Sequence, residues 1–327
     1  MDINVEKTAE KINISGNILL REPMSTHTTF GIGGPADIFA VPEDREDLGR
    51  LISFSSREKI PLHILGGGAN ILAADAGVRG VVAHTGKIAD ISLQGTSLTA
   101  EAGASISRVS EKALELNLSG LEFIYKMPGS TGGALWMNAR CYGSSISELT
   151  EWIEYFDEGG EVHRMYLPHP DYGYKTSPFQ GSTKTICRAC FALERGEKAK
   201  ITSEMSRVYR DRKEKGHFDY PSAGSVFKNN RSFGKPTGAL LDELGLKGLR
   251  RGDAQIAPFH DNIIINLGNA TAQDVHRLME EARGRAREQL GVLICCSSSL
   301  SGVTFSPRAY ASANSWTSEP NSIPRPS

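Results

Sequence analysis

One serine, Ser225, stands where a hydroxyl group could do chemistry. It lies in the stretch DYPSAGSVFKN, after a glycine and before a β-like Val-Phe pair, and Lys228 and Asn229 follow it closely. A serine in this setting can be a nucleophile, a proton donor, a phosphate ligand or a turn residue. The stretch lacks the G-x-S-x-G elbow, and no histidine or acid can be assigned to activate the hydroxyl. These observations disfavour a nucleophile and leave the other three roles open.

Two glycine-rich turns favour a second kind of chemistry, the binding of phosphate. LGGGANIL, which contains Gly66–Asn70, follows an apolar strand, and MPGSTGGALWMNARCYG, residues 127–143, leads through small apolar residues to Asn138. Glycines permit positive φ and close approach of the backbone, so successive N–H groups can surround an anion. Each cluster alone is more often a tight turn. Two clusters joined by strands favour a cradle for a pyrophosphate.

The common nucleotide motifs are not found in the sequence. A G-x-G-x-x-G pattern that starts at Gly66 needs a glycine at the position of Ile71. A G-x-x-x-x-G-K-[ST] pattern around Gly86 fails because Val81 and Ile88 occupy its first and last positions. The sequence therefore indicates neither a Rossmann dinucleotide site nor a P-loop.

The cysteines do not indicate a redox or metal site. Five are present, and Cys187 and Cys190 form a C-x-x-C within TICRACFAL, which is typical of a strand. Residues three apart on a strand point to opposite faces, which disfavours a redox pair or a zinc half-site. We predict that Cys187 and Cys190 are buried structural thiols, and we predict no metal site.

The composition excludes several function classes. The chain has 327 residues, 39% hydrophobic and 23% charged, with a net charge of −1 and mixed signs along its length. These values are typical of soluble globular proteins, and nucleic acid is a poor candidate for a partner. The N-terminus does not resemble a secretory signal, and no run of about 18 apolar residues occurs. We expect a cytoplasmic protein without membrane insertion, and we favour a monomer.

Three regions must position these chemical groups, at about residues 20–85, 86–198 and 199–293. Strands and helices alternate through them with many glycine turns, which predicts an α+β chain with several sheets. Thr271 and Asp274 suit the start of the last helix. The segments with helical spacing are REDLGRLISFSSREK, ISRVSEKALELN, TSEMSRVYRDRKEK and ATAQDVHRLMEEARGRAREQLG. Residues 294–327 differ, because serine and proline dominate and no periodicity survives, and they are typical of an irregular tail.

A resemblance to a known family rests on five segments that occur in order with suitable spacing. They are THTTFGIGGPADIF, LGGGANIL, GLEFIYKMPGSTGGALWMNARCYG, YPSAGSVFKN and IIINLGNATAQDV. The set resembles the UDP-N-acetylenolpyruvoylglucosamine reductases over about residues 20–293. The short segment between YGYKTSPF and SAGSVF has no room for the tyrosine-bearing loop of the longer members, so the chain resembles their short form.

The resemblance implies a fold and a cofactor. Residues 20–198 would form a two-subdomain FAD-binding domain of the vanillyl-alcohol-oxidase type, divided at about residue 85. Residues 199–293 would form an α+β substrate-binding domain. The two glycine loops would hold the FAD pyrophosphate, with flanking residues near the isoalloxazine. The implied cofactor-binding residues are Gly66, Gly67, Gly68, Ala69, Asn70, Pro128, Gly129, Ser130, Gly132, Gly133 and Asn138.

The resemblance also implies a reaction. NADPH would reduce FAD, hydride would pass to the methylene carbon of the enolpyruvyl group, and a proton would be added to the neighbouring carbon. Ser225 matches the family's proton donor, and a hydroxyl suits donation to a strongly basic, carbanion-like centre when a cation such as Lys228 stabilises the resulting oxyanion. Asn229 matches a contact to the nucleotide part of the substrate. Lys215, or less readily Lys213, matches a phosphate lysine. His260 stands at a polar substrate contact, where a structural histidine is an equal alternative.

The sequence departs from the family at three places. Lys175 in GYKTS replaces an arginine that grips the substrate carboxylate, and lysine lacks the planar fork of arginine. Arg140 and Cys141 replace a small pair, and Arg140 either compensates for Lys175 or is simply exposed. Ser297 stands where a catalytic glutamate is expected.

The ending of the chain leaves alternatives open. The resemblance stops between Leu293 and Cys295, as a shifted reading frame near the 3′ end would cause, and we hypothesise that residues 294–327 are out of frame. A catalytically impaired flavin- or UDP-sugar-binding homologue is one alternative function. A flavin oxidase for another substrate is a second, which the motifs of the third region disfavour.

Overall fold

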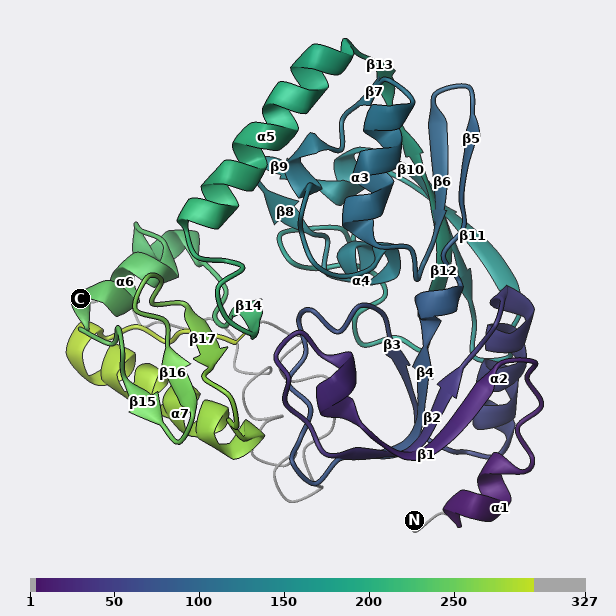
Figure 1. Ribbon diagram of the computed structural model, residues 1–327, viewed down its shortest axis with the longest axis horizontal. Helices are drawn as coiled ribbons and strands as arrows, with labels where there is room; N and C mark the ends of the chain where they lie inside the picture. The colour runs from purple at the N-terminus through teal and green to yellow at the C-terminus, as the bar shows by residue number, and fades with distance from the viewer. Residues whose placement is uncertain (1–3, 297–327) are drawn as a thin grey trace, which may run out of the picture.

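Residues 4–296 are described by a computed structural model, and they form three multi-stranded sheets with helices packed against them (Figure 1). The hydrophobic cores join neighbouring regions, since the core beside the third sheet also contains Phe30 and Leu72, and the core beside the first sheet also contains Phe156. The mixture of helices with largely antiparallel sheets confirms the predicted α+β class. None of the helices in the described part of the chain is long and apolar enough to cross a membrane.

The first sheet is mixed. It comprises β1 (Asn17–Pro23), β2 (Pro35–Val41), β4 (Val78–His84) and β3 (Leu62–Leu65), in that spatial order. β1 runs antiparallel to β2, whereas β2, β4 and β3 are parallel. The predicted helix α2 (Arg45–Arg57) begins where the Asp44 carboxylate accepts the N–H of Asp47, and it buries Leu48, Leu51 and Ile52 at helical spacing. A short helix, α1 (Val5–Ala9), precedes the sheet.

The second sheet is antiparallel throughout. Its order is β11 (Val162–Tyr166), β10 (Thr150–Phe156), β12 (Thr185–Ala192), β6 (Ser97–Glu101) and β5 (Ile91–Gln94). α3 (Ile106–Glu115) and α4 (Thr131–Trp136) accompany it. Cys187 and Cys190 lie in β12 as free, buried thiols, which confirms their predicted structural role.

The third sheet carries Ser225. Its order is β14 (Ser222–Ser225), β17 (Ile263–Asn266), β16 (Ala254–Ile256) and β15 (Arg250–Arg251), all antiparallel. α6 (Thr237–Glu243) and α7 (Ala272–Leu290) pack with it (Figure 1). Thr271 and Asp274 form a capping box at the start of α7, as predicted. Beyond α7, Ile294 is buried in the same core, and the remaining tail, residues 297–327, lies outside the described residues.

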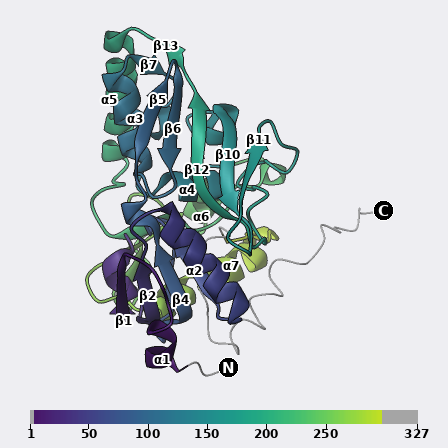
Figure 2. The same cartoon turned by 90° about the vertical axis from the view of Figure 1, so that its right-hand side faces the viewer.

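The long helix α5 (Lys198–Glu214) joins the second region to the third (Figure 1). It packs on α3 and on two short elements of the second region, β7 (Leu118–Ser119) and η3 (Glu122–Ile124). Both views place α3 and α5 on the same side of the five-stranded sheet (Figure 2). The domain boundary at residue 198 stays a prediction. The remaining short elements are β8 (Arg140–Cys141), β9 (Ser144–Ser145), β13 (Glu194–Arg195), η1 (Met24–His27), η2 (Thr85–Lys87), η4 (Ile146–Glu148) and η5 (Arg231–Phe233).

Hydrogen bonds tie the third sheet to the first region. The Thr29 hydroxyl donates to Ser222 O at 2.7 Å, and the Asn266 amide donates to Phe30 O at 3.0 Å. The Asp75 carboxylate accepts the first N–H groups of α7, at 2.7 Å from Ala272 N. A carboxylate at a helix N-terminus is stabilised by the orphan N–H groups and the helix dipole. These ties hold β14 close to the glycine loop at residues 66–68, because Thr29 N also donates to Gly68 O.

Candidate active site

The two predicted glycine loops lie face to face. A Cβ added at Gly67 would stand 2.7 Å from Gly129 Cα, and one added at Gly66 would stand 2.0 Å from Ser130 Oγ. Gly68 has a φ of +60°, and its Cβ would meet His27 O at 2.1 Å. Only glycine permits backbones to approach this closely. We call Gly66–Asn70 together with Gly129 and Ser130 the cofactor cradle.

Several backbone N–H groups of the cofactor cradle are available to bind a ligand. Within residues 4–296, the N–H groups of Gly67 through Asn70 and of Gly129 and Ser130 donate no hydrogen bond to another protein group. Backbone N–H groups are strongly hydrogen-bonding, and several that converge without partners form a nest for an anion. This donor set fits a pyrophosphate, the group that FAD would place there.

Three predicted cofactor residues beside the cradle, Gly132, Gly133 and Asn138, make hydrogen bonds to other parts of the protein. Gly132 N donates to Ala102 O at 2.8 Å, and Gly133 N donates to the Ser130 hydroxyl, which caps α4. Asn138 is buried, has a φ of +43°, and donates its amide to Gly173 O at 2.7 Å. Its amide oxygen accepts the N–H of Ser147 at 3.3 Å. These residues therefore shape the loop and its surroundings through bonds within the protein.

Asn138 also helps to position Lys175. The turn that contains Lys175 is held by the bond from Asn138 to Gly173 and by Gln180, whose amide donates to Trp136 O and Lys175 O. Lys175 is half-buried with a φ of +59°. Burial lowers the pKa of its ammonium group, and electrostatic interactions with Cys141 and Lys228 also act on it. The charge of Lys175 is therefore felt by Lys228, which follows Ser225 in the sequence.

Ser225 ends β14 with its side chain exposed, opposite Ile263 of β17. Asn262 anchors the segment after it, because its amide oxygen accepts Phe227 N at 2.8 Å and its amide nitrogen donates to Phe227 O at 2.9 Å. Lys228 N donates to Cys295 O at 2.9 Å. The serine therefore stands at a free edge of a segment that is otherwise firmly hydrogen-bonded.

Ser225, Asn229 and His260 line one cavity of about 330 Å³. We call it the serine cavity; its other lining residues are Pro236, Gly238, Ala239, Asp242, Phe259, Asp261 and Asn262. Asn229 uses its amide oxygen to accept Thr237 N at 2.9 Å, which leaves its amide nitrogen available as a donor. The fold thus brings His260 together with Ser225 and Asn229, which lie some thirty residues earlier in the sequence.

Two histidines beside the serine cavity are held neutral. His217 and His260 have ring centroids 6.2 Å apart. Burial lowers the pKa of His260, and burial together with Arg212 lowers the pKa of His217 to about 4. Lys215 acts electrostatically on both rings and forms an exposed ion pair with Asp211 at 2.8 Å. Neutral imidazoles can serve as hydrogen-bonding groups at neutral pH.

The departures from the family pattern have distinct surroundings. Arg140 donates to the Ser145 hydroxyl at 2.9 Å and lies 3.6 Å from the Glu148 carboxylate, so its charge is used within its own hairpin. Cys141 instead contacts the buried Arg212. Ser297, the predicted catalytic position, lies outside the described residues.

Sequence reasoning missed Arg212 and Asn262. Arg212 sits in the charged run RDRKEK, which is typical of a solvated helix end, yet the residue is 9% exposed. Its spacing from Met205 and Val208 on the buried face of α5 is the signal that could have found it. Asn262 gave no local signal, because its partner Phe227 is distant in the sequence.

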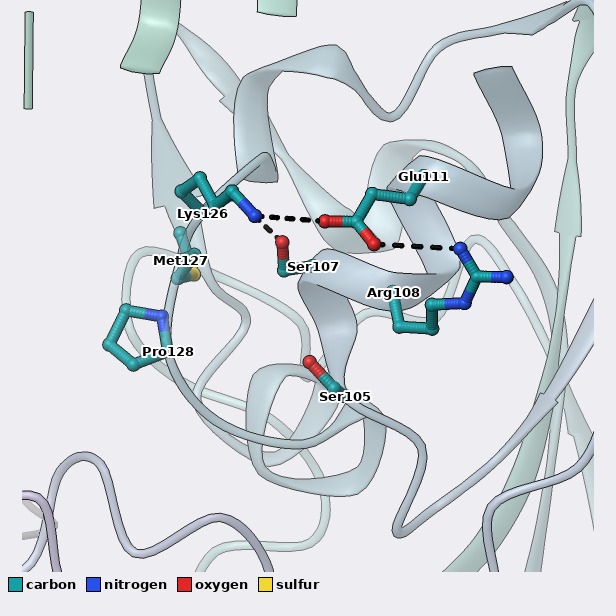
Figure 3. A pocket seen from close by; sticks show the side chains of 7 residues that line it. All are labelled: Ser105, Ser107, Arg108, Glu111, Lys126, Met127 and Pro128. Atoms are coloured by element: carbon teal, nitrogen blue, oxygen red, sulfur yellow. Dashed lines mark hydrogen bonds and ion pairs between the residues drawn. The ribbon is translucent and has the colours of Figure 1, made fainter. Parts of the chain in front are cut away.

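A second cavity, of about 310 Å³, lies at the start of α3 (Figure 3). Pro128 is the predicted cofactor residue on its wall. Its charged groups pair with one another, because Glu111 lies 3.1 Å from Lys126 Nζ and 3.5 Å from Arg108 (Figure 3). The Lys126 N–H donates to the Ser107 hydroxyl at 3.1 Å. The charged side chains of this cavity therefore neutralise one another.

Family models match both parts of the chain. Residues 36–166 match an FAD binding domain, and residues 216–296 match the C-terminal domain of UDP-N-acetylenolpyruvoylglucosamine reductase. The second match reaches residue 296, three residues beyond the predicted end of the resemblance. It also begins after α5.

Relatives and a solved structure agree with these matches. The chain is 41% identical to a UDP-N-acetylenolpyruvoylglucosamine reductase of Caldanaerobacter subterraneus subsp. tengcongensis, over 89% of this chain and 95% of the relative. It is 40% identical to one of Treponema denticola, over 85% and 92%. The crystal structure of the reductase from Thermus caldophilus superposes with a TM-score of 0.72 at 33% identity, covering 86% of this chain and 98% of that one. The chain therefore belongs to the family of UDP-N-acetylenolpyruvoylglucosamine reductases, FAD-dependent oxidoreductases, as its sequence predicts.

Proposed function

We propose that the protein reduces UDP-N-acetyl-3-O-(1-carboxyvinyl)glucosamine to UDP-N-acetylmuramate, with NADPH as the electron donor and FAD as the carrier, in the synthesis of peptidoglycan precursors. The observation that carries the proposal is that the donors of the cofactor cradle and the exposed Ser225 belong to one hydrogen-bonded assembly. Thr29 links them, since it bonds to Gly68 on one side and to Ser222 of β14 on the other.

The cofactor cradle would hold the FAD pyrophosphate through its free N–H groups. Bound FAD supplies hydride transfer, from NADPH and then to the substrate. The backbone donors need no side-chain motion to reach an anion, so the cradle is preorganised before the cofactor arrives. We propose that this arrangement also fixes the isoalloxazine near the turn that carries Lys175.

Ser225 would donate a proton to the carbon beside the substrate carboxylate. Hydride addition to the neighbouring carbon leaves negative charge on this carbon and its carboxylate, so cations around the carboxylate lower the barrier. Lys175 and Lys228 would supply positive charge there and stabilise the alkoxide that Ser225 leaves behind. The loss of a proton from a hydroxyl is favoured when a cation lies near it.

Asn229 would contact the nucleotide part of the substrate, Lys215 its phosphate, and His260 would make a further polar contact to the substrate. Asn229 can donate its free amide N–H, and neutral His260 can hydrogen-bond without repelling a cation. Lys215 can pair with a phosphate in place of Asp211 because its present ion pair is exposed, and exposed pairs are weak.

We further propose that residues 20–198 form the FAD-binding domain, with two subdomains divided at about residue 85, and that residues 199–293 form the substrate-binding domain. We also propose that the protein has the short-form architecture, without the tyrosine loop, and that it is a monomer. Because UDP-sugars and NADPH are cytoplasmic metabolites, we propose a cytoplasmic location. A catalytically impaired homologue is the second candidate function, favoured by Lys175 and Ser297 at positions where the family pattern has an arginine and a glutamate.

An anaerobic flavin titration tests the proposal. The purified protein is expected to carry flavin, to bleach on addition of NADPH, and to recover its absorbance when the enolpyruvyl nucleotide is added. Absence of flavin would contradict the proposed function. Bleaching without recovery would favour the impaired homologue.

A further inference from the structure

A buried arginine, Arg212, faces the hairpin that follows the flavin loop. It occupies the last turn of α5, and its Nη2 donates to Phe123 O and lies 3.3 Å from the sulfur of Cys141. The guanidinium carbon lies 5.5 Å from the ring centroid of Tyr142. Its Nε is buried without any hydrogen-bond partner within the described residues. Buried donors of this kind are almost always satisfied, so this one calls for a ligand.

No carboxylate compensates the charge of Arg212 among residues 4–296. Asp211, its neighbour in sequence, accepts bonds from Lys215 and from the Tyr142 hydroxyl instead. The group in contact with the guanidinium is a thiol, and burial raises the pKa of Cys141, although Arg212 and Lys175 act in the opposite direction. A neutral thiol can orient the guanidinium but cannot balance its charge.

Lys175 carries a second positive charge that acts on Cys141, the thiol in contact with Arg212. Cys141 interacts electrostatically with both Arg212 and Lys175, and no carboxylate acts on the Lys175 ammonium group within the part of the chain that the structure describes. Lys228, which follows Ser225 by three positions, also acts electrostatically on Lys175. Charges removed from water without a partner are costly, and a site that collects them is built for an anion.

We propose that Arg212 and Lys175 together hold the carboxylate of the enolpyruvyl group, with Arg212 supplying the planar fork that a lysine lacks. This inference rests on the proposed function and deepens it. Arg212 becomes a substrate-binding residue that compensates for Lys175, and Arg140 does not, since its guanidinium is bound to Ser145 and Glu148. Cys141 acts as a positioning residue, because its sulfur fixes the orientation of the guanidinium.

Half-reactions of the Arg212→Ala enzyme test the inference. Flavin content and reduction by NADPH are expected to stay within about twofold of wild type, whereas reoxidation by the enolpyruvyl nucleotide falls about a hundredfold or more. Added guanidinium chloride at low concentration should restore part of the reoxidation rate, and sodium chloride at equal ionic strength should not. Arg207→Gln is the matched control, because Arg207 lies on the same helix, pairs with Glu204 and is exposed.

Several outcomes would overturn the inference. Equal slowing of both half-reactions would place Arg212 at the flavin, and an unchanged reoxidation rate would make it a residue of the fold alone. If Arg212→Ala does not fold, the Lys175→Arg enzyme provides the test. We expect its affinity for the substrate to rise less than tenfold, because the guanidinium of Arg212 already binds the carboxylate. A gain of tenfold or more would contradict the inference. A wild-type enzyme that the nucleotide cannot reoxidise would instead refute the proposed function.

Discussion

The cofactor cradle and the serine cavity are built from different parts of the chain. The cradle uses backbone N–H groups on two glycine loops, and its shape depends on close backbone contact, as at Gly67 and Gly129. The serine cavity uses side chains, among them Ser225, Asn229 and His260, and the cations that we propose for the substrate come from separate segments, at Lys175, Arg212 and Lys228. The difference teaches where variation can enter: a backbone site is fixed by glycine, whereas a side-chain site can lose one cation and use another.

The largest effect is expected in the cradle. Gly67→Val would place side-chain atoms against Gly129, so we expect loss of bound flavin and a loss of about 1–3 kcal/mol in the free energy of unfolding. The flavin absorbance of the purified protein and urea denaturation measure both. Gly284→Ala, at an open position of α7, is the control and should keep full flavin. Normal flavin content in Gly67→Val would contradict the backbone account.

The next effect concerns the serine cavity alone. Ser225→Ala should keep flavin and NADPH reduction, because the side chain is exposed and outside the cradle. Reoxidation by the enolpyruvyl nucleotide should fall by about 10²–10⁴, the usual contribution of a general acid. Stopped-flow absorbance measures both steps. A normal reoxidation rate would show that another group delivers the proton.

A smaller effect is expected at the support of the serine cavity. Asn262→Ala removes both bonds to Phe227 and leaves buried backbone groups unpaired, so we expect a loss of about 2–4 kcal/mol in unfolding free energy. Denaturant titration measures it, with flavin content as the second readout. If the variant keeps its flavin but binds the substrate more weakly, the cofactor cradle does not depend on the support of the serine cavity. Wild-type stability would mean that the Asn262 bonds are not formed.

The smallest effect is a dependence of stability on pH. Because the folded pKa of His217 is about 4, the unfolded chain binds more protons than the folded one between about pH 4 and 6.5. The histidine's contribution is therefore present at pH 7 and is lost as the pH falls through this window. His217→Gln should lose less stability than wild type between pH 7 and pH 5. Equal losses in denaturant midpoint would contradict the assignment.

Local patterns predicted the backbone features well. The glycine loops, the apolar face of α2 and the capping box of α7 depend on residues close together in sequence, and the structure confirms α2 and the capping box and brings the loops together. The burial of Arg212 and the two hydrogen bonds between Asn262 and Phe227 could not be predicted from local patterns. Both depend on contacts between distant segments, which local periodicity does not record.

The most direct test of the proposed function is a single turnover of NADPH-reduced enzyme with the enolpyruvyl nucleotide, without oxygen. We predict about one equivalent of UDP-N-acetylmuramate per flavin, measured by mass spectrometry, together with full recovery of flavin absorbance. A flavin that stays reduced while the nucleotide remains unchanged would contradict the account.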